Sequence, residues 1–137
     1  MSRVIKFRAW NPYDKKWENP ERCALRFNGE RYWYVDVKPS WPDVAGHSLE
    51  VEYVQQFTGL LDKNGKEIYE GDVLKNGWIE KSSNYFRFAV EWNSERGGYY
   101  LPDSYNDEYM CNLGTELQED TWETIGNIYE NPELLTK

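Results

Sequence analysis

Apolar and polar residues alternate over many short segments of this chain. In residues 4–10, the side chains of Ile5, Phe7 and Ala9 fall on one face, and the residues between them are charged. An alternation with a period of two predicts a β-strand with one buried face. The same kind of pattern predicts strands at 15–17, 23–27, 31–37, 49–58, 66–69, 73–79, 85–92, 99–101, 109–113 and 122–129.

Turn-forming residues separate these segments. Asn28-Gly29 lies between two strand-like runs, and because both residues tolerate a positive φ this dipeptide predicts a β-hairpin. Residues 38–48 contain two prolines, a glycine and the only histidine, so we expect a loop there. Near the C-terminus, Asn131 followed by Pro132 is a favourable start for one helical turn.

No segment keeps a helical period over the roughly 11 residues that would indicate a longer helix. Many short strands punctuated by Gly, Asn and Pro favour a mainly β fold. We therefore expect a single domain over residues 1–137, built as a small barrel or as two packed antiparallel sheets. SH3-like barrel elements are compatible with this pattern, and helix is limited to the short C-terminal turn.

The composition is that of a folded chain. Aromatic residues make up 17% of the 137 residues, whereas disordered chains are poor in them. Cys23 and Cys111 lie far apart and in no metal-ligand spacing, so we expect two free thiols. The N-terminus lacks the apolar core of a signal peptide, and no apolar run approaches the roughly 18 residues of a membrane span. These features predict a cytoplasmic protein that does not contact a membrane.

The formal net charge is -8, from 24 acidic and 16 basic residues. A field of this sign opposes binding to nucleic acid and to anionic membranes. The plain interpretation of this negative charge is that it keeps the protein soluble. The alternative is that it attracts a partner that is itself basic, such as a nucleic-acid-binding protein. Acidic residues are also concentrated in residues 103–123, which can be a solvated loop or a surface that imitates the spacing of phosphates.

The sequence holds no recognisable catalytic or metal-binding set. Residues 62–67 resemble the start of a calcium-binding loop, but a third carboxylate is missing and Val73 stands at the twelfth position, so a β-turn explains them equally well. His47 is not spaced for a zinc site or for a Cys-His nucleophilic pair with either cysteine. With 24 acids, no general acid–base pair stands out. We therefore expect no enzymatic activity, no cofactor and no metal.

The aromatic residues have two interpretations. They can form the core and cross-strand pairs, or they can present a stacking surface of the kind that binds single strands or carbohydrates. The candidate binding surface consists of two arginines and six aromatic residues: Arg8, Trp10, Trp33, Tyr34, Trp41, Arg87, Tyr105 and Tyr109.

Three blocks of this sequence resemble the YopX family of phage and prophage proteins. The first block is residues 5–10, Ile-Lys-Phe-Arg-Ala-Trp. The second is residues 56–73, which end in Asp-Lys-Asn-Gly-Lys-Glu-Ile-Tyr-Glu-Gly-Asp-Val. The third is residues 125–135, Ile-Gly-Asn-Ile-Tyr-Glu-Asn-Pro-Glu-Leu-Leu. The blocks occur in the order of the family and span nearly the whole chain. The resemblance implies a mostly β fold and an origin in a phage, a prophage or another mobile element. It implies no enzymatic activity, because the family supplies no catalytic residues. The blocks themselves are typical of a shared scaffold.

The leading hypothesis is a non-enzymatic phage or prophage accessory protein that binds a host or phage macromolecule, most simply another protein. One alternative is a small nucleic-acid-binding β-barrel that uses exposed aromatic residues despite the net charge. A second alternative is a protein that sequesters a small molecule in a deep aromatic pocket. A hydrolase is the fourth and least favoured hypothesis. Open edge strands also favour self-association into a homo-oligomer.

Overall fold

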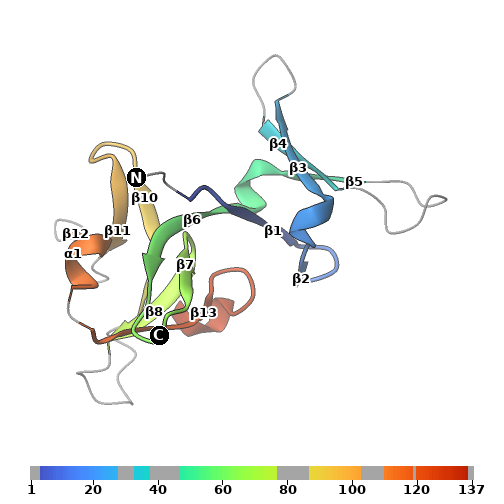
Figure 1. Cartoon of the computed structure of the whole chain (residues 1–137). Helices are drawn as coiled ribbons and strands as arrows, with labels where there is room; N and C mark the ends of the chain where they lie inside the picture. Colours follow the sequence, from blue (N-terminus) through green and yellow to red (C-terminus); the bar gives the residue numbers. More distant parts are fainter. Residues whose placement is uncertain are drawn as a thin grey trace. The chain divides into compact units, whose positions relative to one another are not determined.

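The computed structural model describes residues 4–27, 33–37, 47–76, 87–102, 110–118 and 120–135 (Figure 1). The chain divides into two compact units. Unit 1 comprises Met1–Ile5 and Phe57–Lys137, and unit 2 comprises Lys6–Gln56. The expectation of one domain over residues 1–137 stays a prediction, because compactness alone does not say whether the two units fold together.

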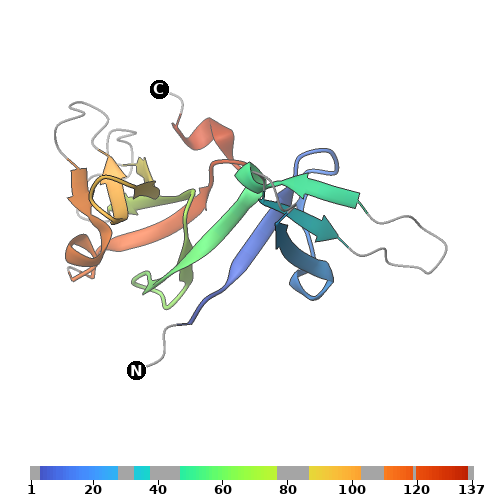
Figure 2. The same cartoon turned by 90° about the horizontal axis from the view of Figure 1, so that it is seen from above.

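Unit 2 is built from short antiparallel strands and two single turns of 3-10 helix. The strands are β1 (Phe7–Asn11), β2 (Lys16–Trp17), β3 (Cys23–Phe27), β4 (Trp33–Val37), β5 (His47–Glu50) and the start of β6 (Val54–Leu61); the turns are η1 (Pro20–Arg22) and η2 (Val51–Tyr53). Strand β1 pairs with β2 and with the start of β6, while β3, β4 and β5 form a separate three-stranded sheet. The three strands of this sheet lie side by side in both views (Figures 1 and 2).

The hairpin predicted around Asn28-Gly29 is confirmed by the register of its strands. Phe27 lies opposite Trp33, and the antiparallel pairing continues to Cys23 opposite Val37. Asn28 and Gly29 themselves lie outside the described residues. The loop expected over 38–48 is wrong at its end, because His47 and the residue after it pair with β4 as the start of β5.

The core of unit 2 is small. Ala9, Val37 and Leu49 are buried, and Cys23 and Val54 pack against them. The single buried face expected for residues 4–10 is wrong in two respects, as the exposed fractions show: they are 63% for Ile5, 42% for Phe7, 3% for Ala9 and 6% for Trp10. Ala9 faces this core from one side of β1, whereas Trp10 on the other side packs on Trp17 of β2. Burial therefore depends on position along the strand as well as on the face.

Unit 1 carries the remaining strands. They are the end of β6, β7 (Glu67–Tyr69), β8 (Asp72–Asn76), β9 (Arg87–Ala89), β10 (Glu91–Asn93), β11 (Gly98–Pro102), β12 (Met110–Asn112) and β13 (Trp122–Asn127). Strand β8 lies between β13 and β9, β11 lies between β10 and β12, and β7 pairs with β6. The core contains six buried residues from all parts of the unit: Ile68, Leu74, Val90, Leu101, Leu113 and Trp122.

The mainly β architecture with little helix is confirmed, and one sheet curls into a half-barrel. The C-terminal helical turn is present as η4 (Pro132–Leu135), with its proline at the first position. A second turn, α1 (Leu113–Glu116), was not expected; it forms because the side chain of Asn112 accepts a hydrogen bond from the backbone of Thr115. The strand expected over 49–58 is two strands separated by η2, because β5 pairs with β4 whereas β6 pairs with β1.

Candidate functional site

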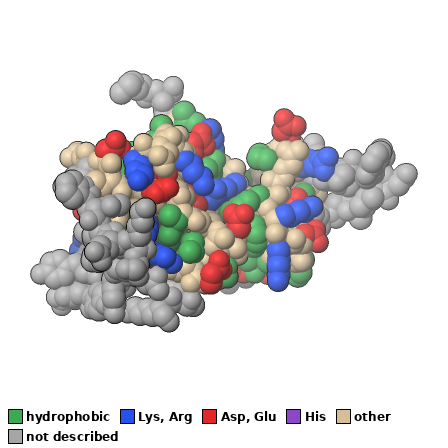
Figure 3. Space-filling view, turned by 90° about the horizontal axis from the view of Figure 1, so that it is seen from below, with side chains coloured by type: hydrophobic (Ala, Val, Ile, Leu, Met, Phe, Trp, Pro, Cys, Tyr) green, Lys and Arg blue, Asp and Glu red, His purple; other side chains and the backbone are tan. Residues whose placement is uncertain are grey.

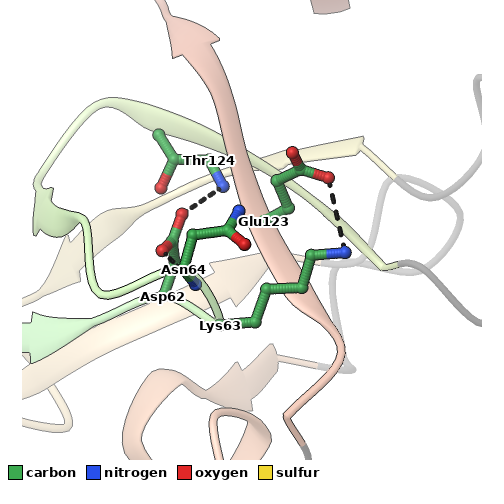
Figure 4. Close-up of polar contacts among 5 residues, drawn as sticks. All are labelled: Asp62, Lys63, Asn64, Glu123 and Thr124. Atoms are coloured by element: carbon green, nitrogen blue, oxygen red, sulfur yellow. Dashed lines mark hydrogen bonds and ion pairs between the residues drawn. The ribbon is translucent and has the colours of Figure 1, made fainter.

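The Asp62 turn (residues 62–66) joins β6 to β7 (Figure 4). One carboxylate oxygen of Asp62 accepts hydrogen bonds from the backbone amides of Asn64 at 2.9 Å and Lys66 at 3.0 Å. Gly65 has a φ of +79°, a conformation that favours glycine. These contacts confirm the β-turn interpretation of the motif that resembles a calcium loop.

The same carboxylate also holds a distant strand. The second oxygen of Asp62 accepts a hydrogen bond from the backbone amide of Thr124 in β13 at 2.9 Å. Beside it, the amide of Lys63 donates to the carbonyl of Trp122 at 3.1 Å, and the Lys63 ammonium lies 3.5 Å from the carboxylate of Glu123 (Figure 4). The turn therefore covers one edge of β13 and fixes it within unit 1.

Asp62 is only 7% exposed and is held as an anion. Burial by itself would raise the pKa of its carboxyl, but hydrogen bonds from the backbone amides of Thr124, Lys66 and Asn64 outweigh burial and place the pKa below the ordinary value. A carboxylate whose two oxygens already accept three amides is poorly suited to proton transfer. We therefore assign Asp62 a structural role.

Asp72 forms a second buried connection in unit 1. Its side chain is 2% exposed and accepts hydrogen bonds from the backbone amide of Tyr69 at 2.8 Å and from the Nδ2 of Asn127 at 3.0 Å. The Oδ1 of Asn127 in turn accepts from the amide of Tyr129 at 3.0 Å. This pair joins the start of β8 to the end of β13.

Gly126 is required by a close approach at the end of β13. A Cβ atom at this position would lie 2.5 Å from Cδ1 of Leu134 and 2.6 Å from Oδ1 of Asn131. Asn131 uses that oxygen to accept a hydrogen bond from the backbone amide of Asn127 at 3.2 Å. The C-terminal turn thus packs directly on the backbone of β13, where no side chain intervenes.

Of the candidate binding surface, Arg8 and Trp10 lie together on one face of β1. The Arg8 guanidinium packs 4.1 Å above the ring of Trp17, and its Nε and Nη2 donate to the Oε1 of Gln55 at 3.2 and 3.1 Å. Trp10 meets Trp17 edge to face at 5.0 Å and is only 6% exposed. Trp17 and Gln55 were not foreseen. The alternation of 15–17 placed Trp17 on a return strand but did not give its register with Trp10.

The remaining candidates lie elsewhere. Arg87 belongs to β9 of unit 1, opposite Lys75 of β8, and its Nε is buried with no hydrogen-bond partner among the residues that the structure describes. Trp33 and Tyr34 are in β4, where only the backbone is described. Three others lie outside the described residues: Trp41, Tyr105 and Tyr109. The part of the chain that the structure describes therefore brings together Arg8 and Trp10 but not the whole set.

Four exposed aromatic residues in the described part of the chain lie outside the candidate binding surface: Phe7, Tyr13, Phe27 and Trp92. Tyr13, in the turn between β1 and β2, is 86% exposed. Trp92 of β10 is 51% exposed and meets Tyr99 of β11 edge to face at 5.0 Å. Tyr13 and Trp92 each belong to a hairpin whose strands pair over only two or three residues, and alternation does not determine exposure over so short a length.

Within the described ranges, no group of three or more His, Cys, Asp or Glu side chains is placed to hold a metal ion. Burial and the neighbouring Glu18 raise the pKa of the Cys23 thiol, so Cys23 is a weak nucleophile at neutral pH. None of the described helices has the length and apolar character needed to cross a membrane.

Charge is divided unequally between the units. Residues 6–56 contain 8 Lys and Arg and 8 Asp and Glu, so the net charge of unit 2 is zero. The other 8 basic and 16 acidic residues belong to unit 1, whose net charge is therefore -8, the charge of the whole chain. On the face drawn in Figure 3 both signs are interspersed. Among the side chains drawn in colour on that face, the acidic residues do not form a single patch.

Comparison with known proteins then decides the family. The family model described as "YopX protein" matches residues 6–136. The chain belongs to the YopX family. The resemblance of the three sequence blocks is therefore confirmed, and the contacts above give those blocks structural roles: they contain Asp62, Asp72, Gly126 and Asn127.

Two solved structures share the fold of this YopX family member. Protein EF1440 from Enterococcus faecalis is 27% identical, with a TM-score of 0.67 over 98% of this chain and 99% of that chain. Protein yopX from Bacillus subtilis is 20% identical, with a TM-score of 0.57 over 96% of this chain and 95% of that chain. A comparison with curated proteins finds no match.

Proposed function

We propose that this YopX family member is a non-enzymatic accessory protein of a phage or prophage, which acts in the cytoplasm by binding a basic protein partner through unit 1. The observation that carries the proposal is the division of charge: unit 1 has a net charge of -8, and unit 2 is neutral. A difference in charge between two parts of one chain gives a partner a preferred part to approach.

The physical effect of this charge is mainly on association. The summed field of an acidic unit raises the local concentration of a basic partner and the rate of encounter, and it disfavours acidic competitors. Unit 1 also displays several carboxylates to solvent, including Glu91 and Glu95 on the β10–β11 hairpin and Glu130 and Glu133 near η4. Neither unit has a net positive charge, which argues against a nucleic acid as the partner.

The non-enzymatic part of the proposal is supported by how the two carboxylates that are buried among the described residues of unit 1 are used. The Asp62 carboxylate accepts hydrogen bonds from three backbone amides. The Asp72 carboxylate accepts hydrogen bonds from one backbone amide and from the side chain of Asn127. Both therefore serve the scaffold.

A pair of charge-matched variants tests the proposal. The unit 1 variant carries Glu91→Gln, Glu95→Gln and Glu133→Gln, and the unit 2 variant carries Glu21→Gln, Glu50→Gln and Glu52→Gln. All six side chains are exposed, and each triple substitution changes the net charge from -8 to -5. The tagged proteins are incubated with host lysate, and the captured proteins are identified and quantified by mass spectrometry at about 0.05 and 0.3 M salt, because salt shortens the range of exposed charges.

We expect a defined set of basic proteins that the wild type and the unit 2 variant retain, that the unit 1 variant loses, and that the higher salt removes. Equal loss in both variants would show that only the total charge matters, and no loss in either would show that charge does not select the partner. Both results contradict the proposal.

A further inference from the structure

Trp92 combines two properties that no other described residue has: it is an exposed aromatic residue, and it belongs to the acidic unit. The other three exposed aromatic residues of the described chain lie in unit 2, whose net charge is zero. The Trp92 side chain is 51% exposed. Single exposed apolar residues are common on protein surfaces, but tryptophan is among the residues most enriched at the energetic centres of protein interfaces.

The β10–β11 hairpin holds the Trp92 ring in place. Trp92 lies directly opposite Tyr99, and the centroids of the two rings are 5.0 Å apart in an edge-to-face contact. Tyr99 in turn packs against the buried core of unit 1. The hairpin turn is closed by two backbone amides: that of Arg96 donates to Oδ1 of Asn93 at 2.9 Å, and that of Gly97 donates to the carbonyl of Asn93 at 2.8 Å. A ring held in this way loses little conformational freedom when a partner binds it.

The arginine of this hairpin packs on a different ring. The Arg96 guanidinium lies 5.6 Å from the centroid of the Tyr100 ring. Tyr100 follows Tyr99 in β11, so the Tyr100 ring and this guanidinium lie on the face of the hairpin opposite to Trp92. Within the described part of the chain, no cation packs on the Trp92 ring. Tryptophan is the aromatic side chain that attracts a cation most strongly, so this ring can accept one from outside the chain.

Two carboxylates lie close to Trp92. Glu91 directly precedes it, Glu95 follows three residues later in the turn, and both side chains are exposed. Although Glu91 projects from the other face of β10, the Cα atoms of both residues lie within about 10 Å of that of Trp92, because each residue spans at most about 3.6 Å. This is about the distance over which exposed charges act at 0.1 M salt. A cation that approaches the ring is therefore attracted by both carboxylates and by the net charge of unit 1.

We propose that the Trp92 ring is the contact point for an arginine side chain of the basic partner, and that Glu91 and Glu95 attract this arginine. The inference rests on the proposed function and adds the point of contact and the residue type that binds there. Arginine suits the ring better than lysine, because its guanidinium is planar and more weakly hydrated and so stacks on aromatic faces. A nucleic-acid base can also stack on tryptophan, but the negative charge of unit 1 opposes the phosphates that would come with it.

A titration of variants with defined probes tests this contact. Trp92→Leu removes the ring and keeps an apolar side chain. Leu61→Ala is the matched control, because Leu61 is also an apolar residue of unit 1 and is 52% exposed. The probes are a short polyarginine peptide, a polylysine peptide of the same length and an oligothymidylate, each titrated into the full chain at about 0.05 and 0.3 M salt. Calorimetry gives the affinity, and circular dichroism verifies that each variant is folded.

Nuclear magnetic resonance shows whether the ring itself is contacted. The indole N–H signal of Trp92 is the one that is absent from the spectrum of Trp92→Leu. We expect polyarginine to shift this signal and to bind the wild type and Leu61→Ala equally at the lower salt. It should bind Trp92→Leu about 3- to 30-fold more weakly, as the loss of one cation–π contact implies, and polylysine should bind the wild type more weakly than polyarginine does.

Five results would each overturn the inference: no binding of polyarginine, an unshifted Trp92 signal, equal affinity of Trp92→Leu and the wild type, equal affinity of polylysine and polyarginine, or tighter binding of the oligothymidylate. The lysate experiment separates this inference from the proposed function. If Trp92→Leu captures the same basic proteins as the wild type and the unit 1 charge variant loses them, Trp92 is not the contact point and the proposed function stands. If the wild type captures no basic proteins, the proposed function itself is contradicted.

Discussion

The Asp62 carboxylate accepts a hydrogen bond from the backbone amide of Thr124 at 2.9 Å, across 62 residues of sequence. The other oxygen of the same carboxylate closes the local turn by accepting the amides of Asn64 and Lys66. One side chain therefore both forms a turn and covers the edge of a distant strand. The first two predictions below follow from this double role.

Asp62→Asn should lower the free energy of unfolding by about 1–3 kcal/mol. The amide keeps the shape of the carboxylate but turns an NH₂ group toward backbone amides that are themselves donors, so at least one bond is lost. Urea unfolding at pH 7 measures the change. Asp120→Asn is the control, because Asp120 is exposed, and its effect should stay within about 0.5 kcal/mol. Equal effects of the two substitutions would contradict the role assigned to Asp62.

Acid should weaken the wild type through Asp62. The pKa of this carboxyl is below its ordinary value in the folded state, because the amide bonds outweigh burial. Its contribution is thus fully present above the ordinary aspartate pKa and is lost as the pH falls through that value toward the folded one. Urea midpoints measured between pH 7 and pH 3 should converge for the wild type and Asp62→Asn at low pH. A difference that stays constant over this range would exclude the linkage.

Gly126→Ala should destabilise the protein by about 1–3 kcal/mol, because the new methyl group would overlap Leu134 and Asn131 in the C-terminal turn. The matched control is Gly114→Ala in α1, where a Cβ would lie 3.3 Å from Oδ1 of Asn112 and alanine is a better helix former than glycine. Thermal unfolding of both variants gives the comparison. If Gly126→Ala unfolds at the same temperature as the wild type, glycine at position 126 is not required for the close packing of η4 on β13.

Asn127→Asp should also cost about 1–3 kcal/mol, because it removes the donor to Asp72 and places a second carboxylate beside a buried one. Asn93→Asp is the control. Asn93 uses its Oδ1 to accept the Arg96 amide at 2.9 Å in an exposed turn, and aspartate retains that acceptor. We expect the control to stay within about 0.5 kcal/mol of the wild type in urea unfolding. A loss as large in Asn93→Asp would mean that burial beside Asp72 is not the cause.

The mainly β class, the hairpin of β3 and β4, the Asp62 turn and the C-terminal helical turn could be predicted from the sequence, because each depends on local backbone preference. Alternation was less informative about exposure. It placed Ile5 and Phe7 on a buried face, yet both are more than 40% exposed, because the core of unit 2 reaches only as far as Ala9. For the candidate binding surface, the sequence supplied Arg8 and Trp10 but not Trp17 or Gln55, which reach Arg8 only through the pairing of β1 with β2 and β6.

The turns, the strands of clear alternation and the total charge of this protein follow from the sequence alone, since they depend on neighbouring residues or on composition. Three features depend on the tertiary structure: the hydrogen bond from Thr124 to Asp62, the hydrogen bond from Asn127 to Asp72, and the covering of the β13 edge by the Asp62 turn. The physical reason is the same in each case: these relations join residues that are distant in sequence, and no local preference determines which distant segments will pair.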